Sequence, residues 1–305
     1  MPGALQDWIG RQQTEADVIT PFPARGMMAL LDRDPQKILT GMPLPPAWHW
    51  LYFRPLTQQS IIDVDGHERR GEFLPPVEAP RRMWAGGRLR FISPLLIGQH
   101  ATRTSTVRSI DIKEGRTGPL TFVIVDHVIH TSNGPVIEEQ QRLVYLGHAV
   151  GHDDHRPTEA NPAALTSDDV PVQYDWSETF LPTAVVLFRF SALTFNGHRI
   201  HYDHPYATVT EGHRGLLVHA PLTALVLLDA ALRHIPHEQD VRDVDDSRSG
   251  LARRRSLFPS LYEFRATNPL YGDEPVKLSG STIEGVSTAR ASAAGTLAMH
   301  SKVYY

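Results

Sequence analysis

The chain has 305 residues, a formal net charge of −4 at pH 7 and a hydrophobic content of 41%, the values of a globular protein large enough for two domains of ordinary size. It contains no cysteine, which excludes disulfides, thiolate catalysis and cysteine-ligated metals, and its acidic balance excludes a general attraction to nucleic acid or to an anionic membrane. No signal-like leader and no apolar run near the ~20 residues of a membrane span is found, so we expect a cytoplasmic protein.

The first half of the chain combines an aromatic segment with a series of strands. The segment Pro45–Phe53 begins with two prolines, which suit the first turn of a helix. The runs that follow are rich in β-branched residues and alternate in polarity, which predicts strands. They cover residues 88–92, 101–112, 121–131 and 136–146, and Ser132-Asn133-Gly134 predicts a hairpin turn between the last two.

A polar stretch without apolar periodicity divides the chain near its middle. Residues 148–173 contain three prolines and two acidic clusters, a composition typical of an interdomain linker. We therefore predict a first domain over residues 1–147 and a second domain over residues 174–305.

The second half places a polar turn before a strongly apolar helix. Residues 185–193 are an apolar run that we predict to be a strand, and it leads into the polar sequence FNGHRIHYD at residues 195–203. Residues 221–233 are apolar nearly all round, which predicts a helix buried on every side. Further strands are predicted at residues 260–266, 275–281, 287–292 and 297–304.

Each half thus reads as a buried helix followed by several long antiparallel strands. A sheet wrapped around a central helix is an α+β arrangement, and its duplication is a tandem, or double, hot-dog fold. The halves show no sequence repeat, so the predicted duplication rests on the order of the elements.

The polar turn and the start of the apolar helix together supply groups suited to chemistry on an acyl thioester. His201 offers an imidazole base that titrates near neutral pH. Asn196 offers a side-chain amide, whose carbonyl oxygen we expect to hold a water molecule. The backbone N–H groups at the start of the predicted helix at residues 221–233, which follows the segment from Gly215, can bind a developing oxyanion. Taken singly, an Asn-Gly pair is typical of a turn and a lone histidine of a hydrogen-bonded core position.

Residues 188–203, FRFSALTFNGHRIHYD, resemble the active-site segment of the MaoC-like (R)-specific enoyl-CoA hydratases. Residues 45–55, 71–76 and 81–87 are similar to the FAS1-like dehydratase domain of one branch, which contains mesaconyl-C4-CoA and itaconyl-CoA hydratases and type 2 hydroxyacyl-thioester dehydratases. The resemblance implies a lyase that adds water to an α,β-unsaturated acyl-CoA, with itaconyl-CoA or mesaconyl-C4-CoA giving citramalyl-CoA.

The resemblance also implies residue roles. The family pattern Asp-x-Asn-Pro-Leu-His places His201 at the catalytic histidine and Asn196 at the catalytic aspartate, where an amide cannot shuttle a proton. The family's later His-Gly pair matches His219 and Ala220, which implies that the Ala220 N–H polarises the thioester carbonyl. Asp203 is expected either to orient the imidazole or to cap the next turn.

A second group of residues is predicted to bind the substrate. Arg199 is a candidate clamp for a substrate carboxylate, or else a member of a surface ion pair. Trp48 is a candidate for the acyl pocket or for the core, and Gly215 and His219 complete the predicted set. The cluster Arg253-Arg254-Arg255 could contact the CoA phosphates or form a solvated loop.

Several other functions stay open at this point. The even spacing of His198, His201 and His204 allows a metal enzyme. A dehydratase acting on another acyl-CoA or acyl-carrier protein, a thioesterase and a non-catalytic acyl-CoA-binding protein are the remaining alternatives. For the hydratase we expect no metal and no cofactor, because the CoA thioester is itself the substrate. A homo-oligomer is left open, since hot-dog sheets commonly pair edge to edge.

Overall fold

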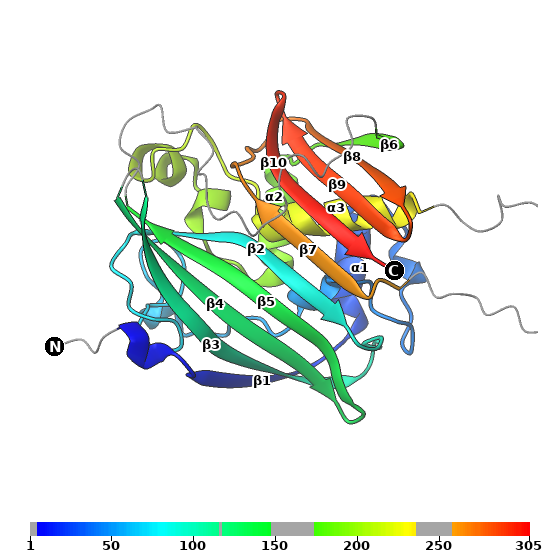
Figure 1. Cartoon of the computed structure of the whole chain (residues 1–305), viewed down its shortest axis with the longest axis horizontal. Coiled ribbons are helices and arrows are strands. Elements are labelled where there is room, and N and C mark those ends of the chain that lie inside the picture. Colours follow the sequence, from blue (N-terminus) through cyan, green and yellow to red (C-terminus); the bar gives the residue numbers. More distant parts are fainter. Residues whose placement is uncertain (1–4, 116–117, 148–173, 236–257) are drawn as a thin grey trace, which may run out of the picture.

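A single antiparallel sheet runs through the described part of the chain. The computed structural model describes residues 5–115, 118–147, 174–235 and 258–305. Their ten strands lie in the order β1-β3-β4-β5-β2-β7-β10-β9-β8-β6. Strands of the first half fill one end of the sheet and strands of the second half fill the other, with α3 behind the second half (Figure 1).

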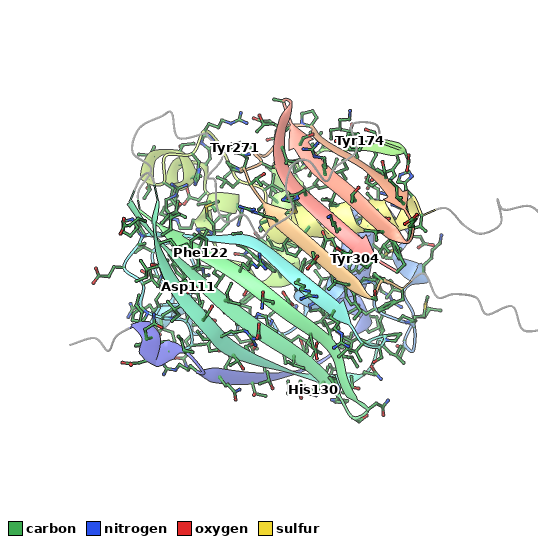
Figure 2. The ribbon with its side chains drawn as sticks, in the orientation of Figure 1. Asp111, Phe122, His130, Tyr174, Tyr271 and Tyr304 are labelled. Carbon is green, nitrogen blue, oxygen red and sulfur yellow. The ribbon has the colours of Figure 1, made fainter. Side chains whose placement is uncertain are left out.

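The first half contributes five strands. Four of them confirm the predicted strands, two of which form the predicted hairpin. Their side chains alternate between buried and more exposed positions, as along β4. Figure 2 shows side chains along this part, among them Asp111, which pairs in register with Phe122. The edge strand β1 was not predicted, because its sequence QQTEADV contains few apolar residues. The strands are β1 Gln12–Val18, β2 Arg81–Phe91, β3 His100–Gly115, β4 Gly118–Thr131 and β5 Gly134–Leu146.

The second half contributes the other five strands and the buried helix. The helix α3, Ala220–Arg233, confirms the predicted buried helix, and Leu222, Leu225 and Leu227 are at most 1% exposed. The short edge strand β6 was not predicted. The strands are β6 Trp176–Phe180, β7 Leu261–Ala266, β8 Val276–Ile283, β9 Val286–Ala293 and β10 Thr296–Tyr304.

Strands β2 and β7 join the two halves. They pair antiparallel, with Gly86 opposite Arg265. A side chain at Gly86 would place its Cβ 2.5 Å from the carbonyl oxygen of Phe264, so this close approach of two backbones requires glycine. The main hydrophobic core also crosses the junction, since α3 packs with Trp48 and Leu51 of the first half.

The predicted strand at residues 185–193 is wrong, because these residues form the helix α2, Ala184–Thr194. Its β-branched and aromatic residues suggested a strand, but the side chain of Thr183 accepts a hydrogen bond from the Val186 N–H and starts a helix. Leu187, Phe190 and Ser191 are buried at helical spacing, whereas Phe188 is exposed.

The predicted helix at Pro45–Phe53 is reduced to one short 3₁₀ turn, Trp48–Leu51, which follows a left-handed residue, Ala47. The helix of the first half is instead α1, Pro21–Leu30, which was not predicted. The predicted linker at 148–173 and the cluster Arg253-Arg254-Arg255 lie outside the described residues. None of the described helices is long and apolar enough to cross a membrane.

We expect the substitution Leu227→Ala to lower the free energy of unfolding by about 2–5 kcal/mol, because it removes buried methyl groups from a helix that is enclosed on all sides. Leu39→Ala is the matched control, since Leu39 is 55% exposed, and it should change stability by less than about 0.5 kcal/mol. Urea unfolding followed by circular dichroism measures both. Equal effects of the two substitutions would contradict the central position of α3.

Candidate active site

An open cavity of about 1610 Å³ lies between the two halves. The first half lines it with strand residues, such as Trp84 and His127, and with the loop at residues 53–74. The second half lines it with the end of α2, the polar turn and the start of α3. Four predicted site residues line this cavity: Asn196, Arg199, His201 and Ala220.

His201 presents a lone pair to this cavity. It ends the short 3₁₀ turn Arg199–His201 and is 7% exposed. Its Nδ1 lies 2.8 Å from the carbonyl oxygen of Leu217. Because a carbonyl oxygen only accepts, Nδ1 carries the hydrogen and Nε2 is the unprotonated nitrogen. Burial, and then the neighbouring His198, lower the pKa of His201 to about 3, so the imidazole is neutral at neutral pH.

His219 supports His201 from behind and does not itself line the cavity. The two rings stack with their centroids 3.6 Å apart and an angle of 20° between their planes. The Nε2 of His219 lies 2.8 Å from the hydroxyl of Ser191 on α2. Burial lowers the pKa of His219 well below its ordinary value, so two neutral imidazoles are stacked here without charge repulsion.

Ala220 opens α3 at the cavity wall. His219 is the N-cap residue, and its carbonyl oxygen accepts the first helical hydrogen bond, from the Thr223 N–H. Pro221 has no N–H, and the Ala220 N–H has no hydrogen-bond partner within the part of the chain that the structure describes. Ala220 thus brings a backbone donor at a helix N-terminus to the cavity wall, and its role as an oxyanion donor stays a prediction.

Asn196 follows the left-handed residue Phe195 that ends α2. Its Oδ1 accepts a hydrogen bond of 2.9 Å from the His198 N–H, as in an Asx turn. This bond uses one lone pair of the oxygen, so the predicted role of this oxygen in holding water stays a prediction, and the side-chain NH₂ is also free to donate to a ligand.

Arg199 and Asp203 bind each other. The Nη2 of Arg199 lies 2.7 Å from Oδ2 of Asp203, and its Nη1 donates to the carbonyl oxygen of Val64 in the first half. The Oδ1 of Asp203 accepts from the Tyr206 N–H at 3.1 Å. Arg199 is therefore in an ion pair, and Asp203 caps the next turn. Each of these is one of the two alternatives that the sequence left open for that residue.

Trp48 and Gly215 do not line the cavity. Trp48 is 2% exposed and packs in the main core. Trp50, two residues on, lines the cavity instead and donates its indole N–H to Glu139. Residues of the aromatic segment thus line the cavity, and the short 3₁₀ turn determines which of its rings does so.

A buried polar group around Glu139 was not predicted. His49 Nε2 lies 2.9 Å from the Glu139 carboxylate, and Trp50 donates to the same group. Burial opposes ionisation, yet the bonds from His49 and Trp50 lower the pKa of Glu139 to about 2. Trp50 and Glu139 form a polar part of the cavity wall, and His49 supports the carboxylate from behind it.

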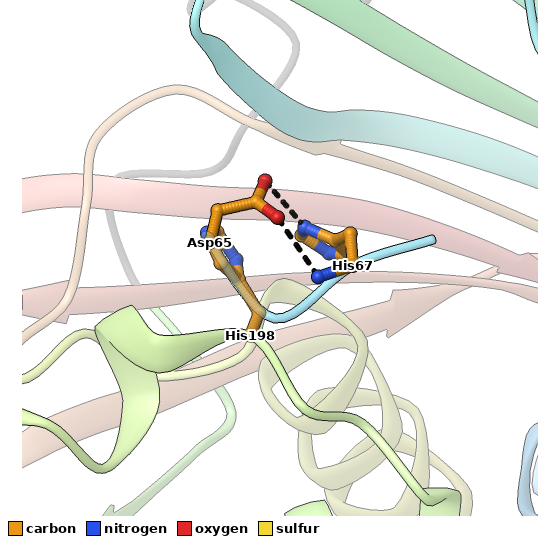
Figure 3. Close-up of side chains that lie close together, drawn as sticks. All are labelled: Asp65, His67 and His198. Carbon is orange, nitrogen blue, oxygen red and sulfur yellow. Dashed lines mark hydrogen bonds and ion pairs between the residues drawn. The ribbon is translucent and has the colours of Figure 1, made fainter. Parts of the chain in front are cut away.

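A second unpredicted group, Asp65 and His67, comes from a loop of the first half and lies against His198 of the polar turn (Figure 3). Asp65 Oδ2 lies 3.0 Å from His67 Nδ1, and Oδ1 accepts from the His67 backbone N–H at 2.8 Å. The rings of His67 and His198 have centroids 4.1 Å apart. The only sequence signal was the turn-forming string DVDGHE at residues 63–68, which does not reveal what the loop contacts.

Asp65, His67 and His198 each offer one atom that could bind a metal ion, and these three atoms lie within 4.8 Å of one another. This set shares only His198 with the three histidines whose spacing suggested a metal site, and the exposed His204 is not part of it. The carboxylate of Asp65 is already occupied by two hydrogen bonds from His67, so the set is built as a hydrogen-bonded acid–histidine pair.

The loop is attached to the polar turn through its backbone. The Arg199 N–H donates to the carbonyl oxygen of Asp65 at 2.9 Å. Gly66 has a φ of +90°, and a Cβ there would lie 1.8 Å from the carbonyl oxygen of Gly197. Glycine is required at residue 66 both for this conformation and for this contact.

Comparisons with known proteins show the family of the chain. A model of the family described as hydroxyacyl-thioester dehydratase type 2 matches residues 47–245. The chain is 44% identical over 227 residues to a mesaconyl-C(4)-CoA hydratase of Chloroflexus aurantiacus, covering 74% of this chain and 78% of that protein. It is 28% identical over 260 residues to a mitochondrial hydroxyacyl-thioester dehydratase type 2 of Schizosaccharomyces pombe, covering 77% of each chain.

Solved structures with low sequence identity share the fold. A MaoC-like dehydratase from Phytophthora capsici superposes with a TM-score of 0.67 at 13% identity, covering 97% of this chain and 96% of that one. The HtdX protein of Mycobacterium tuberculosis gives a TM-score of 0.61 at 15% identity, covering 96% and 99%. These similarities confirm the predicted α+β hot-dog fold.

We expect Gly66→Ala to lower kcat/KM of the reaction catalysed in this cavity by about 100-fold. The added Cβ would push the loop away from the polar turn, and a displacement of ~1 Å in an active site lowers the rate by about that factor. Gly41→Ala is the matched control: Gly41 has a φ of +87°, but its Cβ would meet nothing within 4 Å. Steady-state kinetics of both variants measures the difference. Equal losses in the two would show that backbone strain, and not the contact, is responsible.

Proposed function

The chain belongs to the hydroxyacyl-thioester dehydratase type 2 family of MaoC-like hydratases and dehydratases, and on that basis we propose that it hydrates an α,β-unsaturated acyl-CoA at the cavity between its halves. One observation carries the proposal. His201, with an unprotonated Nε2, Asn196, and Ala220, with an unpartnered N–H, line one cavity. These are a base, a water-binding donor and an oxyanion donor.

In the proposed reaction His201 is the base. Its neutral imidazole accepts a proton from water through Nε2, and the bond from Nδ1 to Leu217 holds the ring in the required tautomer. The oxygen of the water adds to Cβ as the electron pair of the double bond moves onto the thioester oxygen. The Ala220 N–H stabilises that oxygen, a contribution of roughly 3–4 kcal/mol in known oxyanion holes.

Asn196 positions the water in this proposal. Its NH₂ group donates to the water oxygen, which leaves a water hydrogen free to point at His201. Arg199 and Asp203 then act on the turn that holds both residues and not on the substrate, because their charges are already paired. The observed pairing argues against the predicted carboxylate clamp at Arg199.

The substrate that we propose is a branched dicarboxylic enoyl-CoA. The support is the 44% identity to a mesaconyl-C(4)-CoA hydratase. Mesaconyl-C4-CoA is the first candidate, with citramalyl-CoA as product. Itaconyl-CoA is the second candidate and gives the same product only after its double bond has been moved into conjugation with the thioester, by proton removal at Cα and return at the terminal CH₂. A metal-free reaction in the cytoplasm, with acyl-CoA as the partner molecule, belongs to the same proposal.

A second function is favoured by the relatives named as hydroxyacyl-thioester dehydratases. The same groups catalyse the reverse reaction, because the base and the oxyanion donor serve water addition and water loss alike. In that case the enzyme removes water from a 3-hydroxyacyl thioester, carried on CoA or on an acyl-carrier protein.

A panel of acyl-CoA substrates tests the proposal. We expect the purified protein to hydrate mesaconyl-C4-CoA, with itaconyl-CoA, a monocarboxylic enoyl-CoA and 3-hydroxyacyl-CoAs measured alongside by liquid chromatography. His201→Ala should lower kcat by about 10²–10⁴-fold, since it removes the general base. Release of free CoA without hydration would show a thioesterase, and binding without turnover would show a non-catalytic protein.

The pH profile provides an independent test. Because burial and His198 lower the pKa of His201 to about 3, the base stays unprotonated at all higher pH values. We therefore expect no acid-side loss of kcat/KM between about pH 8 and about pH 5, where the ordinary histidine pKa of 6.5 would produce one. A fall centred near pH 6.5 would contradict the neutral, buried state of His201.

A further inference from the structure

Position 196 leaves the proposed reaction without its second proton-transfer group. Hydration has two parts: the oxygen of the deprotonated water adds to Cβ, and a proton must then reach Cα. The amide of Asn196 can hold water but cannot carry a proton. Another titratable group that faces the same cavity would complete the reaction.

Three imidazole rings form a row along the cavity wall, from His201 to the first half of the chain. His198 lies edge-on to His201, with centroids 5.4 Å apart, and His67 lies tilted against His198 at 4.1 Å. All three residues line the cavity. A ring nitrogen of His67 lies within 4.8 Å of a ring nitrogen of His198, a gap that one bridging water can span. Proton transfer between the rings would therefore run through bridging water.

Two carboxylates flank this histidine row. Asp65 binds His67 Nδ1 at 3.0 Å, and Glu211 Oε1 lies 3.7 Å from His198 Nε2. A carboxylate behind an imidazole stabilises the imidazolium that forms when the ring accepts a proton, as in hydrolase triads. A positive charge that moves along the row is therefore stabilised at His67 and at His198.

The tautomer of His67 suits this role. Because a carboxylate only accepts, the His67 nitrogen bonded to Asp65 carries the hydrogen, and Nε2 has the free lone pair. Burial and the nearby Arg82 lower the pKa of His67 to about 3. The ring is therefore neutral at rest, and an imidazolium formed there gives up its proton readily.

We propose that His67, supported by Asp65, is the terminal group of a proton relay from His201 through His198, and that it returns the proton of the water to Cα. The proposal rests on the hydratase function proposed above. His201 Nε2 takes a proton from water as the O–Cβ bond forms and the π pair moves onto the thioester oxygen. The proton passes along the row to His67 Nε2. It is then transferred to Cα as the enolate electron pair forms the C–H bond and the thioester carbonyl is restored, so all three rings end neutral.

The attachment of the loop explains how a group from the first half can act in this site. The hydrogen bond from the Arg199 N–H to Asp65 and the contact of Gly66 with Gly197 fix the loop to the same turn that holds His198 and His201. Asp65 and His67 thus keep a constant distance from the base.

Four variants test the relay with mesaconyl-C4-CoA as substrate. We expect His67→Gln to lower kcat by at least about 100-fold with little change in KM, because proton transfer and not binding is lost. Asp65→Asn keeps the size of the side chain and should lower kcat by at least about 10-fold. The control His204→Gln changes an exposed histidine of the same segment and should keep full activity. Adding Asn196→Asp to His67→Gln places a proton-carrying group beside His201 and should restore at least about 10-fold of the loss.

The rescue distinguishes a relay from a structural role, since a carboxylate at residue 196 does not rebuild the contacts of His67. The relay is overturned if His67→Gln keeps kcat within about 3-fold of the wild type, or if the double variant is no faster than the single one. Loss of wild-type activity in EDTA, restored by zinc, would also overturn it, because the three side chains would then bind a metal. Wild-type turnover itself tests the hydratase function, and only the variant-to-wild-type ratios test the relay.

Discussion

The hydrogen bond from His201 Nδ1 to the Leu217 carbonyl oxygen determines what the rest of the site can do. It fixes the tautomer, so the basic nitrogen faces the cavity. The backbone holds the acceptor in place: the Leu217 N–H donates to Ile200 beside the histidine, and the next residue, Val218, donates to Leu270. The hydrogen bond to this uncharged carbonyl raises the pKa of the ring by less than burial lowers it. The site therefore combines a well-oriented base with a low pKa.

Much of the architecture could be predicted from the sequence, because long alternating strands and an all-apolar helix carry strong local signals. The strands around the 132–134 turn and the helix at residue 220 are examples. α2 could not be recognised, because valine and phenylalanine favour strands until a cap at Thr183 and burial at helical spacing decide otherwise. In the same way, β1 becomes a strand only through its pairing with β3.

The site was predictable only where one segment holds it. His201, Asn196 and Ala220 lie within 25 residues of sequence that align with a family pattern, although Asn196 and Ala220 depart from it, and all three line the cavity. Asp65 and His67 lie more than 100 residues away and join the site through a backbone contact between Gly66 and Gly197. A contact between two backbones leaves no mark on side-chain chemistry, so a pattern of residue types could not show it.

The amide at residue 196 is consistent with the electrostatics of the whole cavity. Asp65 and Glu211 already place two ionised carboxylates beside the histidine row, and Glu139 adds a third to the opposite wall. A further carboxylate at the half-buried residue 196 would lie near like charges and would raise the pKa of His201 toward the charged form. Asparagine makes the same turn-forming bond to the His198 N–H without that charge. In the relay that we propose, the supporting carboxylate is Asp65, which lies behind His67 at the far end of the histidine row.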